Sequence, residues 1–439
     1  MQTVPQNGQR LKTPNLAENR ALRLATLCML YVSQGITFGF TSTAVKNYLN
    51  ARQVSLAETG AILSYISLPF ALKFLWGPVM DRWGYQPMGR RRPWILIAQG
   101  GAVIGLTIFA FMPGMDTVSP AMLTTLALMT LMTNLFASMQ DVAVDALAID
   151  LLPEKERGTV SALMYGGSYF GTFFGGWFVG MVLTKFGFRE AFLVQAGLLA
   201  LIMLLPMFLR ERRGEKLFPW TEGKPMAPES ASSAASFQQL LGWIVRAFSN
   251  FRALAFGVFA ALVYLGGTAL TTIRSHYFIN HGGWSEKDYN ALESVWGVWF
   301  GLAGCLVGAV AGRIDARLRV AVSSVVLGGL WCWFAASDLE IFREKGVLTA
   351  FALSAEFVKA FMAVSMFAMF MAIADKRVSA TQFTAYMALL NLSTGAAQRW
   401  AGSISDWFGI QGAHVAMAGF QVAILALLLV GKPRQTSDL

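Results

Sequence analysis

The chain has 439 residues, of which 55% are hydrophobic and only 14% are charged, and its mean hydropathy is +0.51. Soluble domains carry roughly 25% charged residues, so this composition excludes a protein that is surrounded mainly by water. The formal net charge of +10 could indicate either nucleic-acid binding or a membrane protein with basic loops. The position of the basic residues along the chain separates these two classes.

The predicted elements begin with a polar segment over residues 1–21, which lacks the apolar core and cleavage site of a signal peptide and predicts a cytoplasmic tail. Apolar stretches of about 20 residues, the length of a membrane-spanning helix, then recur almost to the end of the chain. They predict an all-α membrane protein with twelve transmembrane helices, near residues 22–43, 56–79, 94–112, 121–149, 159–183, 190–209, 252–275, 289–312, 319–337, 348–374, 380–404 and 411–431.

The basic residues are distributed unevenly between the two sides of this predicted bundle. With both termini in the cytoplasm, Lys and Arg are about three times as frequent in cytoplasmic segments as in external loops, as the positive-inside rule requires. The charge therefore predicts the orientation of a multi-pass protein of the bacterial inner membrane, and it does not indicate a nucleic-acid partner. The lipid bilayer is the expected surrounding of the chain.

The sequence gives no sign of a metal site or a cofactor. The three cysteines, Cys28, Cys305 and Cys332, lie far apart in apolar segments without metal-ligand spacing, and they predict small packing residues. No Gly-rich nucleotide-binding loop followed by Lys and Ser or Thr is found, which argues against transport driven directly by ATP. His276 and His281 fall in the loop after the seventh predicted helix, where we expect them to face solvent.

A long polar stretch divides the predicted helices into two groups of six. Residues 210–250 are rich in Pro, Ser, Ala and charges and predict a flexible cytoplasmic linker. It separates a half over 22–209 from a second half over 251–431, with a short cytoplasmic tail at 432–439. Similar motifs, GPVMDR and AGRID, end the second and eighth helices. Two parallel six-helix repeats are typical of the major facilitator fold, which binds its solute between the halves near the middle of the membrane.

Specific motifs in the first half resemble one branch of that superfamily. LPFALKFLWGPVMDRWGYQPMGRRRPW at 68–94 and MQDVAVDALAIDLLPEKERG at 139–158 are similar to the AmpG-like family of muropeptide permeases and acetyl-coenzyme A transporters. LYVSQGITFGF at 30–40 and SATQFTAYMALLNLS at 379–393 add weaker support. The resemblance implies a secondary transporter that works by alternating access and imports a muropeptide or another peptide-bearing solute with protons. A monomer is the default expectation.

Other functions remain open at this point. A siderophore or a coenzyme A thioester is an alternative solute within the same fold, because the charges inside the predicted helices are mixed in sign and select none of these compounds. An integral membrane enzyme is a more distant alternative, since no catalytic constellation lies in a loop. We therefore expect a transporter and not an enzyme.

The hairpin between the second and third helices carries charges of both signs. By resemblance, its aspartate faces the start of the eleventh helix and its arginines face the acidic end of the fourth, where Asp145 or Asp150 could meet them. Such contacts would form a cytoplasmic latch that holds an outward-facing state, and the alternative is a simple anchor of positive charge. The latch candidates are Asp81, Arg82, Arg90, Arg91, Arg92 and Asp150.

Three charged residues lie in predicted helices of the first half away from the first turn of the helix. Lys73 and Asp141 lie about 12 and 13 Å from the cytoplasmic ends of the second and fourth helices at 1.5 Å per residue, and so at matching depth. Asp145 shares a helical face with Asp141 at i, i+4. Charges within a membrane usually line a cavity or pair with a partner. The cluster predicts a proton-coupling centre or a solute anchor, or alternatively a static ion pair.

The second half offers a further set of candidates. Glu356 and Lys359 are spaced i, i+3 on the tenth helix, and Glu356 and Arg399 both lie about 28–30 Å from the cytoplasmic ends of their helices. We expect a structural ion pair or an outer gate there. Other polar residues could contact a solute or bond a neighbouring helix: Gln34, Tyr165, Tyr169, Asn391 and Gln398.

Overall fold

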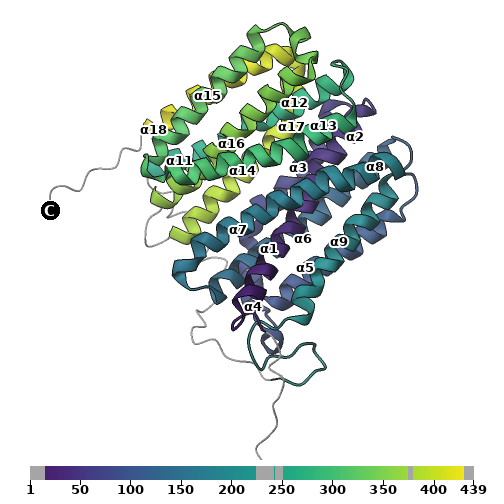
Figure 1. Cartoon of the computed structure of the whole chain (residues 1–439), viewed down its shortest axis with the longest axis vertical. Helices are drawn as coiled ribbons and strands as arrows, with labels where there is room; N and C mark the ends of the chain where they lie inside the picture. The colour runs from purple at the N-terminus through teal and green to yellow at the C-terminus, as the bar shows by residue number, and fades with distance from the viewer. Residues whose placement is uncertain (1–14, 224–241, 243–250, 374–378, 430–439) are drawn as a thin grey trace, which may run out of the picture.

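The computed structural model describes residues 15–223, 242, 251–373 and 379–429. Within these ranges the regular structure is helical, and the helices form two bundles that lie side by side (Figure 1). Each bundle has its own hydrophobic core. One core is built from residues between Leu16 and Leu209, and the other from residues between Phe256 and Leu428 together with Leu56.

The helices of the first half follow the chain from Arg20 to Phe208. They are α1 Arg20–Gly39, η1 Phe40–Val45, α2 Lys46–Ala51, α3 Leu56–Ala71, η2 Lys73–Leu75, α4 Trp76–Arg82, η3 Gln86–Met88, α5 Arg92–Ala110, α6 Pro120–Leu151, α7 Glu154–Phe173, η4 Phe174–Val179, α8 Gly180–Phe186 and α9 Phe188–Phe208. Polar side chains that accept a main-chain N–H begin several of them, as N-cap residues do: Asn19, Ser55 and Ser119.

The second half has the same order of long helices. They are α11 Phe251–Leu262, α12 Leu265–Asn280, α13 Glu286–Ala291, η5 Leu292–Trp296, α14 Gly297–Val310, η6 Ala311–Arg313, α15 Ala316–Ala336, η7 Leu339–Arg343, α16 Lys345–Ile373, α17 Ser379–Ala423 and α18 Ala426–Leu429. His276 lies inside α12 and not in a loop, because this helix continues five residues beyond its predicted end.

Nine segments of the described residues are long and apolar enough to cross a membrane. One of them, Phe383–Leu429, has 47 residues, which is about 70 Å of helix and twice the thickness of a bilayer. The backbone at Gly409 leaves the helical conformation (φ 63°) and divides this segment into two spans. Segments 56–82 and 154–186 complete the twelve predicted helices within the described ranges. The first is broken at Leu72, and the second begins with a run of charged and polar residues.

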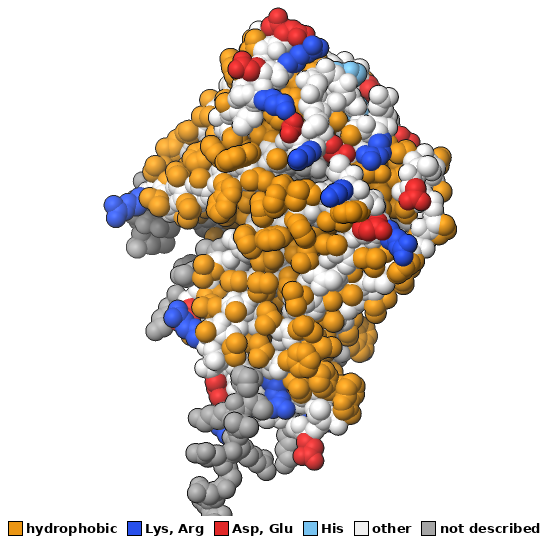
Figure 2. All heavy atoms as spheres, turned by 45° about the vertical axis from the view of Figure 1, so that its right-hand side comes forward, with side chains coloured by type: hydrophobic (Ala, Val, Ile, Leu, Met, Phe, Trp, Pro, Cys, Tyr) orange, Lys and Arg blue, Asp and Glu red, His pale blue; other side chains and the backbone are white. Residues whose placement is uncertain are grey.

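The outer surface of the bundles suits lipid. Large apolar side chains on the perimeter are more than half exposed, among them Ile104, Leu201, Leu306 and Val310. Hydrophobic side chains cover the middle of the face in Figure 2, and most of its charged side chains gather toward the ends. The chain is therefore a multi-pass membrane protein, with its polar groups either at the ends of the helices or inside the bundle.

Small residues allow the closest helix contacts. α1 packs against α7, and a Cβ at Gly171 would lie 2.1 Å from the Val32 carbonyl oxygen. Further along, the chain winds into η4, a π-helical turn that packs against η1 of the same half and η5 of the other. Gly176 in η4 leaves room for the Ser294 side chain of the second half. π-Helical turns, which are frequent at functional sites, therefore form part of the contact between the two halves, and α3 packed against α17 forms its most extensive part.

The first part of the predicted linker is folded against the first half. Residues 209–223 pack beside residues 15–19 and the start of α5, and this end of the molecule is called the tail end below. The main-chain N–H of Leu16 donates to the Arg210 carbonyl at 2.9 Å. The Glu211 carboxylate is 1% exposed and accepts the N–H groups of Arg90 and Arg91 at 3.1 and 2.7 Å, as well as that of Arg92. Burial raises the pKa of Glu211, against the effect of these N–H groups.

Candidate transport site

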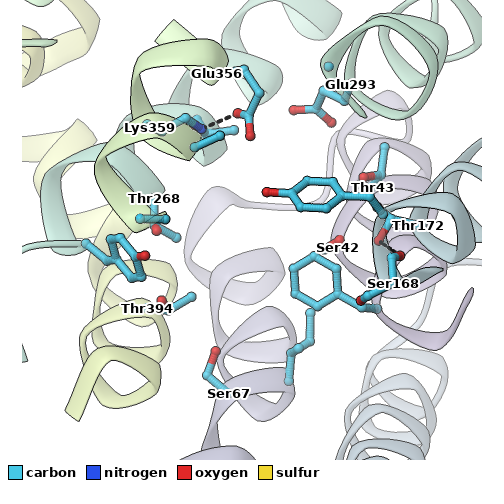
Figure 3. Close-up of a pocket in the computed structure, with 18 of the residues that line it drawn as sticks. Ser42, Thr43, Ser67, Ser168, Thr172, Thr268, Glu293, Glu356, Lys359 and Thr394 are labelled. Carbon is cyan, nitrogen blue, oxygen red and sulfur yellow. Dashed lines mark hydrogen bonds and ion pairs between the residues drawn. The ribbon is translucent and has the colours of Figure 1, made fainter. Parts of the chain in front are cut away.

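A cavity of about 590 Å³ lies between the two halves and is lined by both (Figure 3). Its volume is in the range of small-molecule sites. Hydroxyl groups form a band around it, and Figure 3 shows Ser42, Thr43, Ser168 and Thr172 from the first half opposite Thr268 and Thr394 from the second. Charged side chains line both ends of this band.

Polar contacts close the end of the cavity that is remote from the tail end. This end, formed by α2, α8 and α13, is called the far end below (Figure 1). The buried Lys46 ammonium contacts both Glu293 carboxylate oxygens at 2.7 and 2.8 Å. Asn47 donates to Asn290 at 2.7 Å and to Glu293 at 3.1 Å. These contacts join α2 of the first half to α13 and η5 of the second.

The far-end contacts continue outward along α2. The Asn50 amide donates to Ser275 at 3.1 Å, and Arg52 lies 3.4 Å from Glu286. Glu286 also accepts a hydrogen bond of 2.7 Å from the Thr184 hydroxyl. Among the described residues, every ion pair between the halves lies at this end. The structure therefore describes a state that is closed at the far end.

The structure brings Lys73 and Asp141 together at the lower part of the cavity. Their Nζ and Oδ2 atoms are 2.7 Å apart, and both side chains line the cavity. Lys73 begins η2, directly after the break in the second span. There α3 ends at Ala71, two residues after Pro69. Asp145 does not line the cavity. It accepts a hydrogen bond of 2.5 Å from the Tyr31 hydroxyl and lies one helical turn from Asp141.

The remaining polar candidates of the sequence analysis also line the cavity: Gln34, Tyr165, Tyr169, Asn391 and Gln398. The Gln34 Nε2 and Gln398 Oε1 atoms are buried without a hydrogen-bond partner among the described residues. Asn391 donates to the Met387 carbonyl of its own helix at 2.9 Å. Tyr165 is half exposed to the cavity and contacts the Tyr31 ring edge at a centroid distance of 5.7 Å.

The predicted ion-pair group of the second half is only partly assembled. Glu356 and Lys359 form an ion pair of 2.6 Å, and both line the cavity. Arg399 is exposed and has no ion-pair partner among the described residues. Glu356 lies eleven residues from the far end of α16, or about 16 Å, and so near mid-membrane. Counting residues from the cytoplasmic end of this helix in the sequence placed Glu356 near the outer surface. That count was misleading because α16 has 29 residues and is longer than the bilayer is thick.

Three charged cavity residues escaped the sequence analysis. Lys46 lies beyond the predicted end of the first helix, which continues through η1 to Ala51. Arg274 falls in the last predicted turn of the seventh helix, which continues to Asn280, and Glu293 was not singled out. The signal that could have located Lys46 is the Ser55 N-cap, which begins the next helix well beyond position 43.

The predicted cytoplasmic latch is also rearranged. Arg91 Nε lies 3.2 Å from Asp150 Oδ2, so this pair forms as expected. The Arg92 guanidinium instead donates to main-chain carbonyl groups at the end of α9 and in the segment after it, and Asp145 faces Tyr31 and not the arginines. Arg90 contributes its N–H to Glu211, and exposed Arg82 lies beside the Trp83 ring.

The latch contacts that the structure describes lie within one half. Arg91 and Asp150 are both residues of the first half, so their pair does not by itself join the two halves. The side chain of Asp81, which by resemblance would face the eleventh helix, lies outside the described residues. The role of Asp81 in a latch therefore stays a prediction.

Comparison with known proteins now places this geometry in a family. The sequence profile of the Major Facilitator Superfamily matches residues 25–264, which is more than half of the chain. The chain belongs to the Major Facilitator Superfamily. The predicted fold of two six-helix halves is thereby confirmed.

The relatives of this superfamily member include AmpG-type proteins. The anhydromuropeptide permease of Escherichia coli K12 is 23% identical over 395 residues, which cover 88% of this chain and 74% of the permease. The putative transporter AmpG 1 of Rickettsia conorii is 23% identical over 330 residues, which cover 70% of this chain and 73% of that protein. These relatives confirm the AmpG-like resemblance that the sequence motifs indicate.

Solved major facilitator structures superimpose on nearly the whole chain. The nucleoside transporter NupG matches with a TM-score of 0.67 and 16% identity, over 94% of this chain and 99% of NupG. A POT family transporter in complex with a thioalcohol-conjugated peptide matches with a TM-score of 0.64 and 12% identity, over 96% of this chain and 99% of that structure. At these identities the likeness shows the shared fold alone. The family and its relatives make the chain a membrane transporter of a small-molecule solute.

Proposed function

We propose that this transporter imports a muropeptide or another peptide-bearing solute together with protons, by alternating access. The observation that carries the proposal is the Lys73–Asp141 ion pair of 2.7 Å at the cavity wall, with Asp145 bonded to Tyr31 directly behind it. One cation and two carboxylates leave an uncompensated negative charge when both carboxylates are ionised. Binding one proton balances the cluster, which favours its movement through a low-dielectric environment.

The distribution of contacts supports alternating access. Ion pairs and amide bonds join the halves at the far end, through Lys46, Glu293, Asn47 and Asn290. The expected orientation, with basic loops and both termini in the cytoplasm, makes the far end periplasmic and the described state inward-facing. Rocking of the halves would break the far-end contacts and close the cavity at the tail end, which gives the outward-facing state.

The proposed proton path follows from the position of the cluster. Asp141 contacts the cavity, whereas Asp145 is reached through the Tyr31 hydroxyl. A proton that binds Asp141 from the periplasm weakens its ion pair with Lys73 and frees the lysine to contact the solute. Release of the proton in the inward-facing state restores the pair. The alternative is a static role in which the pair only joins α6 to η2, and accumulation by the Asp141→Asn variant distinguishes the two roles.

The proposed solute rests on the relatives and on the cavity lining. Relatives that are named for anhydromuropeptide transport suggest a sugar joined to a peptide. The band of Ser and Thr hydroxyls offers donors and acceptors to sugar hydroxyl and amide groups, and Tyr165, Phe367 and Tyr169 offer apolar ring surface. A siderophore or a coenzyme A thioester remains an alternative, and an enzyme would be recognised by chemical alteration of the solute.

Uptake into proteoliposomes tests the proposal. Labelled anhydro-muropeptide is added outside vesicles with and without an inside-alkaline pH gradient, and the recovered label is checked for chemical identity. We expect accumulation of the unchanged compound only with the gradient. Equilibration without accumulation would remove proton coupling, and absence of uptake by folded protein would remove the muropeptide and direct the search to the two alternative solutes.

A further inference from the structure

The charges of the cavity do not cancel. Seven charged side chains of the described residues line it, and six of them form three ion pairs: Lys46 with Glu293, Lys73 with Asp141, and Lys359 with Glu356. The seventh is Arg274, on α12 near the far end. Among the described residues, no carboxylate lies within the 4.0 Å of an ion pair from Arg274. The cavity lining therefore carries one unbalanced positive charge, which belongs to the second half.

The surroundings of Arg274 are those of a receptor group and not of a structural arginine. The side chain is 5% exposed, its Nε has no hydrogen-bond partner among the described residues, and its guanidinium lies 5.2 Å from the Phe351 ring centroid. The Tyr289 hydroxyl lies beside it, and the His414 ring and the paired Lys46 ammonium are also close enough to interact with its charge. A phenol and an aromatic face stabilise a guanidinium without neutralising it.

Two other arginines show the structural arrangement for comparison. Arg23 is 7% exposed and donates to the carbonyl groups of Leu16 and Ala17 at 3.0 and 2.9 Å. Arg319 is 5% exposed and donates to the Gly308 carbonyl at 2.8 Å. Both tie segments of the backbone together, and neither lines the cavity. The Nε atoms of all three arginines lack a hydrogen-bond partner among the described residues, so this feature does not separate them. Arg274 has the same burial as Arg319, but it faces the cavity and makes no main-chain hydrogen bond among those described.

We propose that Arg274 binds a carboxylate group of the transported solute. A buried guanidinium without a counter-charge is costly, and a carboxylate satisfies two of its N–H groups at once with planar, bidentate geometry. Lys46 and Lys359 lie at the same end of the cavity, but Glu293 and Glu356 balance their charges, so Arg274 carries the net positive charge there. The assignment rests on the proposed function and adds to it, because it requires a free carboxylate on the solute, directed toward the far end.

The assignment also orients the solute relative to the proton-coupling cluster. Arg274 belongs to the second half and lies about 9 Å from the far end of α12, six residues before Asn280. Lys73 and Asp141 belong to the first half and lie about 14 and 15 Å from the tail ends of their segments, at Arg82 and Leu151. A solute with its carboxylate on Arg274 contacts both halves, so its binding couples their positions.

A pair of solutes that differ only in the carboxylate tests the assignment. Uptake of labelled anhydro-muropeptide with free peptide carboxyl groups is compared with uptake of the same compound with those groups converted to primary amides. The proteins are the wild type, Arg274→Gln, Arg274→Lys and the matched control Arg319→Gln, with Arg23→Gln as a second control. Because the readout is the ratio of acid to amide uptake for each protein, it does not depend on how much of a variant is folded.

We expect the wild type to prefer the acid by about tenfold or more, as for loss of a hydrogen-bonded charged group. Arg274→Gln should lose this preference, Arg274→Lys should keep part of it, and both controls should keep it fully. Equal uptake of acid and amide by the wild type, or an unchanged preference in Arg274→Gln, would overturn the assignment of Arg274. The proposal that the protein transports a muropeptide would still stand. Uptake of neither compound by the wild type would overturn the muropeptide proposal and this assignment together.

Discussion

Replacement of Asp141 by Asn tests the coupling cluster most sharply. The amide keeps the size of the side chain and a carbonyl oxygen for Lys73, but it removes the ionisable group of the 2.7 Å pair. Breaking a fully buried ion pair destabilises a protein by about 3–5 kcal/mol. Because Lys73 is 18% exposed and the amide oxygen can still accept a hydrogen bond from its ammonium group, we expect a smaller loss of roughly 1–3 kcal/mol. The variant should therefore fold.

The expected effect on transport is larger than the effect on stability. A pH gradient of one unit supplies about 1.4 kcal/mol per proton, which supports about a tenfold concentration ratio for one proton per solute. With the membrane potential clamped to zero, wild-type vesicles should approach this ratio. Asp141→Asn should reach a ratio of about one at any gradient, while exchange of labelled for unlabelled solute continues, because exchange requires no net proton movement.

A matched control separates coupling from general damage. Asp288 pairs with Lys345 at the exposed far end and does not line the cavity. Asp288→Asn should accumulate solute as the wild type does. If Asp141→Asn accumulated the muropeptide to the wild-type ratio under the same gradient, the assignment of the cluster to proton coupling would be refuted, and Lys73–Asp141 would be a structural pair.

Three further predictions concern gating, packing and the tail end. Cysteines at positions 47 and 290, introduced after removal of the native cysteines, should form a disulfide across the far end that stops uptake until a reductant is added; undiminished uptake by the cross-linked protein would contradict closure at this end. Gly171→Ala should destabilise the protein by about 1–3 kcal/mol through overpacking, because its Cβ meets the Val32 carbonyl oxygen, whereas Gly166→Ala, with open space around its Cβ, should not; equal melting temperatures would refute the packing argument. Burial raises the pKa of Glu215 to about 7, so ionisation opposes folding and stability falls as pH rises from the ordinary carboxyl value toward 7; the melting temperature of Glu215→Gln should exceed that of the wild type more at pH 8 than at pH 5, and a constant difference would contradict the shift.

The positions of the helices could largely be predicted from the sequence, since membrane spans are defined by composition alone. The predicted helix 319–337 corresponds to α15 Ala316–Ala336, and 94–112 corresponds to α5 Arg92–Ala110. The ends were less accurate where a span is polar and buried between the halves. The first helix, predicted to end at 43, continues to Ala51 because α2 is covered by the second half and not by lipid.

The site was predictable only where one residue pair carried the signal. Lys73 and Asp141 could be matched because both lie in the middle of apolar helices of one half, where depth follows from counting residues. Arg274 and Glu293 could not be placed, because their contacts depend on how the second half meets the first. Lys46 lies beyond the predicted end of the first helix, and its role depends on the Glu293 carboxylate of the other half, which the sequence does not place near it.

The most direct test of proton-coupled import is to measure proton movement caused by the solute itself. Vesicles that contain a pH-sensitive dye and have equal pH on both sides receive external anhydro-muropeptide, with the membrane potential clamped. Solute entry should acidify the interior of wild-type vesicles and leave the pH of Asp141→Asn vesicles unchanged. Entry of the solute into wild-type vesicles without acidification would contradict the account.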